Sequence, residues 1–210
     1  MRDVSRRGVL VGAGAVAVML ATGSTARALG PKPLMRPPTI ESDEDFLARC
    51  IRCQRCVNVC HARVIQPTSL LEGFATTGTP SMVFLHDYCD FCETENGGVP
   101  RCAEACPTSA LKADVEKPFV SALPSIVERN CIAYNQDACR VCVDVCPRAA
   151  IGQDDKGRPV IDVSSCDGCG LCELKCPSVA IGNSSNLVGN GKGVVLRPRS
   201  EVSSEEGGMR

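Results

Sequence analysis

Residues 166–177, "CDGCGLCELKCP", place four cysteines in the spacing C-x2-C-x2-C-x3-C and follow the last one with proline. A similar run, "CIRCQRCVNVCH", occupies residues 50–61, with His61 in the place of the proline. Thiols this close together suggest three kinds of chemistry: disulfides, zinc, or an iron–sulfur cluster. Most of what the sequence says about fold and function depends on the choice between them.

The same arrangement recurs, so that sixteen of the 210 residues are cysteine. The second and third sets are stretched inside the motif but keep the C-x3-C-P ending. The four sets are Cys50, Cys53, Cys56 and Cys60; Cys89, Cys92, Cys102 and Cys106; Cys131, Cys139, Cys142 and Cys146; and Cys166, Cys169, Cys172 and Cys176. Because the chain has no Trp, two Tyr and five Phe, we expect the cysteines to help hold the fold together.

The spacing of the cysteines favours iron–sulfur chemistry. Disulfides stabilise most when they close long loops, whereas these cysteines cluster, and residues 107–130 and 177–210 contain none. Zinc sites of four cysteines usually consist of two separated C-x2-C pairs. In the C-x2-C-x2-C-x3-C-P run, three thiolates bind one cubane and the fourth binds the neighbouring cluster. We therefore expect four [4Fe–4S] clusters with all sixteen cysteines as iron ligands. A structural zinc or disulfide protein is the alternative.

The first 28 residues are typical of a twin-arginine signal peptide. Arg6 and Arg7 precede an apolar stretch, and Ala26, Arg27 and Ala28 form an A-x-A cleavage site. The twin-arginine route carries folded proteins, so clusters can be inserted in the reducing cytoplasm before export. We therefore expect a periplasmic protein, free or peripheral to the inner membrane. No run of about 18 apolar residues predicts a dedicated membrane span.

The remaining sequence indicates an α+β fold of short hairpins and short helices. Residues 29–45 are rich in proline and predict an extended tether, and residues 186–210 predict a flexible tail with at most one edge strand. The run "AIGQDDKGRPVIDV" predicts a hairpin that turns at Gly157. Proline after the last cysteine of sets two to four predicts the first turn of a short helix.

With these motifs, the chain resembles the MauM/NapG-type ferredoxin family, periplasmic electron-transfer proteins with four [4Fe–4S] clusters. The resemblance rests on "SRRGVL", "CIRCQRC", "CRVCVDVCP" and "CDGCGLCELKCP". It implies two nested ferredoxin-like dicluster modules, residues 46–80 with 161–185 around residues 86–160. In the wider group the first motif pairs with the fourth and the second with the third. The implied ligand sets are Cys50, Cys53, Cys56 and Cys176; Cys166, Cys169, Cys172 and Cys60; Cys89, Cys92, Cys102 and Cys146; and Cys131, Cys139, Cys142 and Cys106.

The resemblance also implies an electron carrier and not an enzyme. The sequence contains no nucleophile motif, phosphate-binding glycine loop or flavin fingerprint outside the signal, and its formal charge of −1 argues against nucleic-acid binding. In the family, electrons arrive from a membrane ferredoxin-type or quinol-oxidising partner and leave to a periplasmic molybdenum reductase or c-type cytochrome. Nitrate reduction is the commonest setting. The alternative is a maturation factor for a periplasmic quinoprotein such as methylamine dehydrogenase.

Charged side chains differ between the first two cysteine sets. The first set is surrounded by Arg49, Arg52, Arg55 and Arg63, and the second by Asp87, Asp90, Glu93 and Glu95. Cations near a cluster favour its reduced form and carboxylates oppose it. Two readings remain open: the two regions dock different partners, or these are ordinary solvated loop charges.

Overall fold

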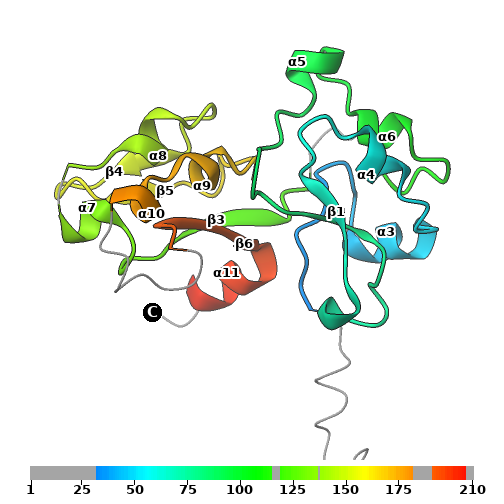
Figure 1. The fold of residues 1–210 in the computed structure, drawn as a ribbon, viewed down its shortest axis with the longest axis horizontal. Helices are drawn as coiled ribbons and strands as arrows, with labels where there is room; N and C mark the ends of the chain where they lie inside the picture. The colour runs from blue at the N-terminus through cyan, green and yellow to red at the C-terminus, as the bar shows by residue number, and fades with distance from the viewer. Residues whose placement is uncertain (1–31, 115–118, 137, 182–190, 207–210) are drawn as a thin grey trace, which may run out of the picture. The chain divides into compact units, whose positions relative to one another are not determined.

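The computed structural model describes residues 32–114, 119–136, 138–181 and 191–206 (Figure 1). The expected signal peptide, residues 1–28, lies outside these ranges. Contacts divide the chain into two units, Met1–Lys32 with Ser69–Thr77 and Pro33–Thr68 with Gly78–Arg210. Among the described helices, none is long and apolar enough to cross a membrane.

The elements are short helices and two-stranded antiparallel sheets, which confirms the expected α+β class. The helices are α3 (Asp43–Arg49), α4 (Arg55–Val59), η1 (Leu70–Glu72), α5 (Glu93–Asn96), α6 (Arg101–Glu104), α7 (Ile132–Asn135), α8 (Val141–Asp144), α9 (Leu171–Lys175), α10 (Ser178–Ile181) and α11 (Arg199–Glu206). The strands are β1 (Ile65–Pro67), β2 (Pro80–Met82), β3 (Ala122–Ile126), β4 (Ile151–Gln153), β5 (Pro159–Ile161) and β6 (Val194–Pro198).

Each sheet has a defined register. Strand β1 pairs with β2, and β4 pairs with β5 in the expected hairpin, with Ile151 opposite Ile161. Gly157 has a φ of +74°, as the tight hairpin turn requires. Strand β3 pairs with β6, which lies far away in the sequence, over five residue pairs from Ala122 opposite Pro198 to Ile126 opposite Val194.

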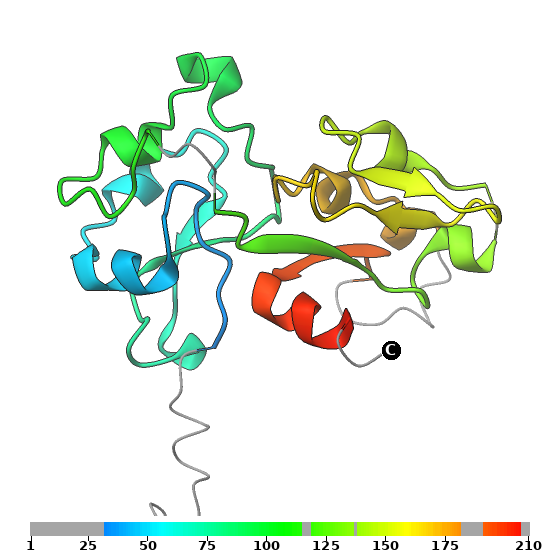
Figure 2. The same cartoon turned by 180° about the vertical axis from the view of Figure 1, so that it is seen from behind.

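The helices that carry cysteines pack in two pairs, α4 with α6 and α8 with α9. We call the first pair with α3, α5, β1 and β2 the N-terminal module, and the second with α7, α10, α11 and β3–β6 the C-terminal module (Figures 1 and 2). The two modules therefore follow one another in the sequence, and the nested arrangement that the resemblance implied is wrong. The physical reason is local: the helix of each odd-numbered cysteine set packs against the helix of the next set along the chain.

The proline-rich segment within residues 29–45 is packed and does not form a tether. The side chain of Arg36 is 1 % exposed, and its guanidinium donates hydrogen bonds to Asp43 (2.7 Å) and Thr79 (2.8 Å). It also lies over the ring of Phe46, 5.1 Å from the centroid. Composition predicted an extended chain, but a buried cation with carboxylate, hydroxyl and aromatic partners fixes this chain against the N-terminal module.

The expected flexible tail, residues 186–210, is also partly ordered. Residues 194–198 form β6, whose Val194 is 2 % exposed, and α11 follows directly. Pairing with β3 satisfies the backbone hydrogen bonds of this strand and buries its apolar face. The sequence predicted at most an edge strand here, because the partner strand is about seventy residues away in the chain.

Candidate metal centres

A short helix carries the third cysteine of every set. Cys56 lies on α4, Cys102 on α6, Cys142 on α8 and Cys172 on α9, and all four side chains are buried. The helices expected after the motif prolines form only at Pro177, which directly precedes α10; the other two prolines lie in turns. The sequence therefore predicted short helices, but it placed them after the last cysteine of a set. In the structure they carry the third cysteine, and only α10 follows a motif proline.

Left-handed residues curl the cysteine loops. In the fourth set Gly168 and Gly170 have φ values of +72° and +88°. In the first set Arg52 and Gln54 occupy the equivalent positions, at +58° and +61°. A chain that turns left-handed on both sides of the second cysteine bends around a centre, which brings three thiols of one loop to the same cavity.

The sixteen thiols come together in four groups, which we call sites A to D. Three of the groups, those of sites A, B and C, each line a cavity. In site D the thiols are close enough to raise one another's pKa. Site A contains Cys50, Cys53, Cys56 and Cys106; site B contains Cys60, Cys89, Cys92 and Cys102; site C contains Cys146, Cys166, Cys169 and Cys172; and site D contains Cys131, Cys139, Cys142 and Cys176.

This grouping corrects the ligand sets that the resemblance implied. The first three thiols of each expected set do lie together, but the fourth member differs in all four sites. Cys106 and not Cys176 completes site A, and Cys146 and not Cys60 completes site C. The last cysteine of a set follows the short helix, so it reaches whichever cavity the packed partner helix presents. Those partners belong to adjacent sets.

Burial makes the thiol form of the cysteines more favourable than the thiolate. The pKa rises to about 11 at Cys56 and to about 12 at Cys102, Cys142 and Cys169. The largest cause is desolvation, and neighbouring thiols of the same site add to it. Four thiolates can therefore share one cavity only if a positively charged group replaces their protons, which is the behaviour of a metal site.

Backbone N–H groups point at several of the sulfurs. The pKa of Cys106 and Cys176 lies below its usual range: burial opposes this, but hydrogen bonds from nearby N–H groups and a hydroxyl outweigh it. At Cys176 the donors include Gly193 N–H, 3.2 Å from Sγ. Ala150 N–H lies 3.3 Å from Cys146 Sγ in the same way. Such donors stabilise negative sulfur and tune an iron–sulfur cluster.

The distances between sulfurs fit a cluster better than a single ion. All sixteen cysteines are free thiols. Four thiolates around one zinc ion lie about 3.8 Å apart, given tetrahedral Zn–S bonds of about 2.3 Å. Among the described residues, which include every cysteine, no three sulfurs lie within 4.8 Å of one another. The cavities between them are therefore shaped for a group larger than one metal ion, as a [4Fe–4S] cubane is.

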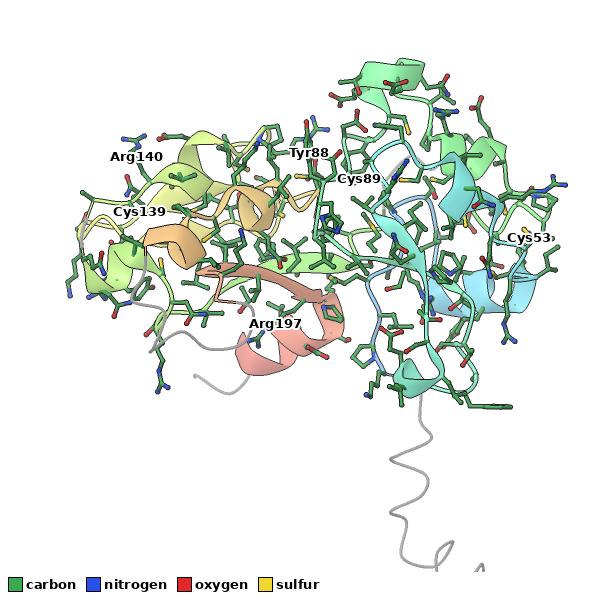
Figure 3. The ribbon with its side chains drawn as sticks, in the orientation of Figure 1. Cys53, Tyr88, Cys89, Cys139, Arg140 and Arg197 are labelled. Carbon is green, nitrogen blue, oxygen red and sulfur yellow. The ribbon has the colours of Figure 1, made fainter. Side chains whose placement is uncertain are left out.

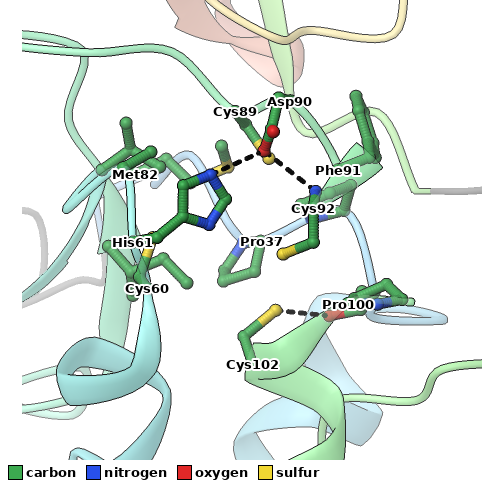
Figure 4. A pocket seen from close by; sticks show the side chains of 15 residues that line it. Pro37, Cys60, His61, Met82, Cys89, Asp90, Phe91, Cys92, Pro100 and Cys102 are labelled. Atoms are coloured by element: carbon green, nitrogen blue, oxygen red, sulfur yellow. Dashed lines mark hydrogen bonds and ion pairs between the residues drawn. The ribbon is translucent and has the colours of Figure 1, made fainter. Parts of the chain in front are cut away.

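His61 completes the wall of site B, as Figure 4 shows. Its Nε2 lies 3.1 Å from Asp90 Oδ1, while its buried Nδ1 has no hydrogen-bond partner. In Figure 4 this second nitrogen points into the cavity that Cys60, Cys92 and Cys102 surround. An orphaned buried polar atom on a cavity wall is what remains when a cavity is built to hold a further group. The sequence singled out His61 as a departure from the motif, but nothing in it indicated the pairing with Asp90.

Sites B and C meet at the boundary between the modules. Cys89 N–H of site B donates a 2.8 Å hydrogen bond to the carbonyl of Cys169 in site C. Beside it, the guanidinium of Arg148 contacts Asp167 (2.7 Å) and Glu93 (3.3 Å), one carboxylate from each module. Sequence reasoning missed this junction, because Arg148 and its partners are far apart in the chain.

The four sites follow one another in the order A, B, C, D. Within the N-terminal module, α4 with Cys56 of site A packs against α6 with Cys102 of site B; within the C-terminal module, α8 with Cys142 of site D packs against α9 with Cys172 of site C. The contact of Cys89 with the Cys169 carbonyl links the two pairs. In Figure 3, Cys53 of site A and Cys139 of site D lie on opposite sides of Cys89.

Paired four-thiol sites of this kind define a ferredoxin-like iron–sulfur protein. The family model described as "4Fe-4S dicluster domain" matches residues 49–110 and 130–180, which together cover more than half of the chain. The chain therefore belongs to the 4Fe-4S dicluster family. Each matched range contains two consecutive cysteine sets, the first and second or the third and fourth, in agreement with the consecutive arrangement of the modules.

Named relatives confirm the expected resemblance. The chain is 35% identical over 117 residues to "Methylamine utilization ferredoxin-type protein MauM" of Methylophilus methylotrophus, covering 54% of this chain and 49% of the relative. It is 32% identical over 154 residues to "Ferredoxin-type protein NapG" of Escherichia coli K12 (70% and 62%) and 31% identical over 149 residues to "Ferredoxin-type protein NapF" of the same organism (71% and 73%). The chain thus spans about half of MauM's length and three-fifths of NapG's. No solved structure matches the chain.

Proposed function

We propose that this chain is an electron carrier that holds four [4Fe–4S] clusters and passes electrons one at a time along sites A to D. The linear order of the four cysteine sites carries the proposal: helix packing places site A next to site B and site D next to site C, and the hydrogen bond of Cys89 to Cys169 links sites B and C. Membership of the 4Fe-4S dicluster family supports the cluster type. A [4Fe–4S] cluster supplies one-electron redox chemistry.

The residues of the chain have three roles in this function. Cysteine thiolates hold the clusters, and backbone N–H groups such as that of Gly193 stabilise negative sulfur. Buried side chains, among them Phe84 and Leu111, keep water away from the cysteine sites. The chain needs no acid, base or nucleophile for this task, in keeping with a carrier and not an enzyme.

Site A is the best candidate for exchange with a partner protein. Cys53 is the one exposed cysteine of the sixteen, and residues 51–55 are exposed without interruption. Arg52 and Arg55 in this loop suit a partner whose docking surface is acidic. At site D, by contrast, Cys131, Cys142 and Cys176 are all buried.

The acidic residues around the second cysteine set have a different role from the one first considered. Asp90 contacts His61 and caps the amide N–H of Cys92, and Glu93 contacts Arg148. Site B also lies inside the row of sites and not at its end. These carboxylates therefore support local structure and the junction between modules, and we propose partner docking at the arginines of site A alone.

The proposed setting is the periplasm, reached by twin-arginine export and either free or peripheral to the inner membrane. A membrane ferredoxin-type or quinol-oxidising protein would supply electrons, and a periplasmic molybdenum reductase or c-type cytochrome would accept them, most simply in a nitrate-reductase-type system. The sequence pattern of residues 1–28 supports the export step. Replacing Arg6 and Arg7 with Lys should keep the protein in the cytoplasm; unchanged export would contradict this route.

A second candidate function is maturation of a periplasmic quinoprotein such as methylamine dehydrogenase. It is favoured by one observation, that MauM, named for methylamine utilization, is as similar to this chain as NapG is. Genetic deletion separates the two functions. Loss of a mature quinoprotein supports maturation, whereas loss of electron delivery to an intact reductase supports the carrier.

Iron and acid-labile sulfide, measured on the full chain purified without oxygen, test the cofactor directly. We expect about sixteen of each per chain and broad visible absorption that dithionite bleaches. Stoichiometric zinc, or a metal-free chain without free thiols, would instead leave only the structural alternative.

A further inference from the structure

Exposed apolar side chains gather in the turn Ser69–Thr77, which contains η1. Leu70 is 63% exposed, Leu71 85% and Phe74 73%. Eight large apolar side chains in the described part of the chain are exposed, and three of them lie within residues 70–74. Single exposed apolar residues are ordinary, but a local concentration of this kind marks an interaction surface.

Several backbone groups of this turn have hydrogen-bond partners within it. Ser69 N–H donates to a carboxylate oxygen of Glu72 (2.6 Å), and Gly73 N–H donates to the carbonyl of Leu70 (3.3 Å). The hydroxyl of Thr77 donates to the carbonyl of Gly73 (2.8 Å). Backbone groups that already have partners lose little when water is removed, which is the condition for entering the boundary between lipid headgroups and acyl chains.

The sequence on either side of the turn carries almost no charge. Between Arg63 and Asp87, Glu72 is the only Asp, Glu, Lys or Arg, and its carboxylate is held inside the turn. Lys32 N–H donates to the carbonyl of Glu72 (3.4 Å), so the N-terminal segment enters the described fold at this turn. The apolar stretch of residues 9–20 lies twelve residues before Lys32, within about 40 Å of extended chain.

From these observations we propose that the turn Ser69–Thr77 docks on the surface of a lipid bilayer. Leu70, Leu71 and Phe74 enter the interface, and the apolar stretch of residues 9–20, where it is retained, provides a second attachment. One weak apolar anchor gives only reversible binding, and two give stable binding. A second copy of the chain fits this surface less well, because three side chains fall far short of the 20–30 residues that a stable protein interface contributes on each side.

Vesicle sedimentation tests the proposal with cluster-loaded protein that begins at Leu29. We expect this form to sediment with vesicles of phosphatidylethanolamine and phosphatidylglycerol, and the full chain to sediment more strongly. Changing Leu71→Ser together with Phe74→Ser should lower the bound fraction at least tenfold. The matched control, Leu85→Ser with Val160→Ser, removes two side chains of similar exposure (71% and 53%) elsewhere and should leave binding unchanged.

A depth measurement guards against misfolding of the double variant. The chain contains no Trp, so the Phe74→Trp variant carries one fluorophore at the turn. Its emission should shift to the blue with vesicles and be quenched by brominated lipid, whereas that of Val160→Trp should not.

Absence of vesicle binding by the parent protein, or an equal response at both positions, overturns the proposal. A dimer that the double variant abolishes, without vesicle binding, overturns it in favour of self-association. Iron content and visible spectrum report on the clusters separately, so this proposal can fail while the carrier function stands.

Discussion

The two modules use one plan but close their outer sites differently. In the C-terminal module the chain continues past the last cysteine and returns through β6, so Gly193 N–H reaches Cys176 and Lys192 Nζ contacts the Cys176 carbonyl (3.0 Å). In the N-terminal module the loop that contains Cys53 stays exposed, and no segment among the described residues returns over it in this way. The cysteine motif therefore determines which thiols come together, whereas the segments outside it determine which outer site is exposed.

The equivalent loops of sites A and C show a second difference. Both bend through left-handed residues, but the loop of site C uses Gly168 and Gly170, whereas that of site A uses Arg52 and Gln54. A left-handed conformation costs a non-glycine residue about 1–2 kcal/mol. The loop of site A thus tolerates strain and keeps a cationic side chain where we propose that electrons are exchanged.

Removal of iron should have the largest effect on both modules. The clusters proposed for the four sites would link segments of each module through their thiolates. Without metal, the free energy of unfolding should therefore fall by most of its value, more than about 5 kcal/mol. Residual hydrogen-exchange protection should be confined to the β3–β6 pair, which is held by backbone hydrogen bonds. Circular dichroism in a denaturant series measures the loss of stability, and hydrogen exchange measures the residual protection. A metal-free chain that unfolds at the same midpoint as the loaded one would contradict the role of the clusters in the fold.

Gly170→Ala should come next, because it affects the junction of the modules. A Cβ at this residue would lie 2.2 Å from the ring of Phe84, and φ is +88°. Backbone strain and overpacking together should destabilise the protein by about 2–5 kcal/mol, read from the denaturant midpoint. Gly97→Ala is the matched control, with a φ of +59° and no atom within 4 Å of the Cβ, so only the strain cost of about 1–2 kcal/mol is expected. Equal losses of stability in the two variants would show that the contact of Gly170 with Phe84 does not contribute to the junction.

Replacing Arg52 and Arg55 with Ser should change electron exchange at site A without changing iron content. Oxidation of the reduced protein by anionic ferricyanide should slow by about three- to tenfold at low salt and become less salt-dependent. Oxidation by cationic hexaamminecobalt(III) should not slow. Arg140→Ser, beside Cys139 of site D, is the control and should leave both rates close to those of the parent protein. If Arg140→Ser slows oxidation by ferricyanide as much as the Arg52 and Arg55 replacements do, electron exchange is not confined to site A.

The smallest effect is expected from Gln54→Gly, which gives the loop of site A the residue type of Gly170 at the equivalent position. Removal of left-handed strain should stabilise the loaded protein by up to about 1 kcal/mol, reduced by the greater freedom of glycine in the unfolded chain. The denaturant midpoint measures the change. A lower midpoint would show that the side chain of Gln54 contributes more than its backbone strain costs.

The sequence predicted the α+β class and the β4–β5 hairpin, because each depends on local spacing. That all sixteen cysteines bind iron stays a prediction, and the sequence did not predict the fourth cysteine of any site. The motif requires only that its last cysteine serve a neighbouring cavity, and packing of α4 on α6 and of α8 on α9 decides which one. Composition also predicted an extended tether around Arg36, and this prediction was wrong. The burial of Arg36 depends on contacts with Asp43, Thr79 and Phe46, and composition carries no information about such contacts.

Iron content of two quadruple variants tests the consecutive pairing of the sites most directly. The first variant changes Cys50, Cys53, Cys56 and Cys106 to Ala, and the second changes Cys50, Cys53, Cys56 and Cys176 to Ala. In the structure the first set empties site A alone, whereas the second set damages sites A and D. We predict about twelve iron atoms per chain in the first variant and about eight in the second, at four per cluster. The reverse result, about eight and about twelve, would contradict the consecutive modules and restore the nested arrangement.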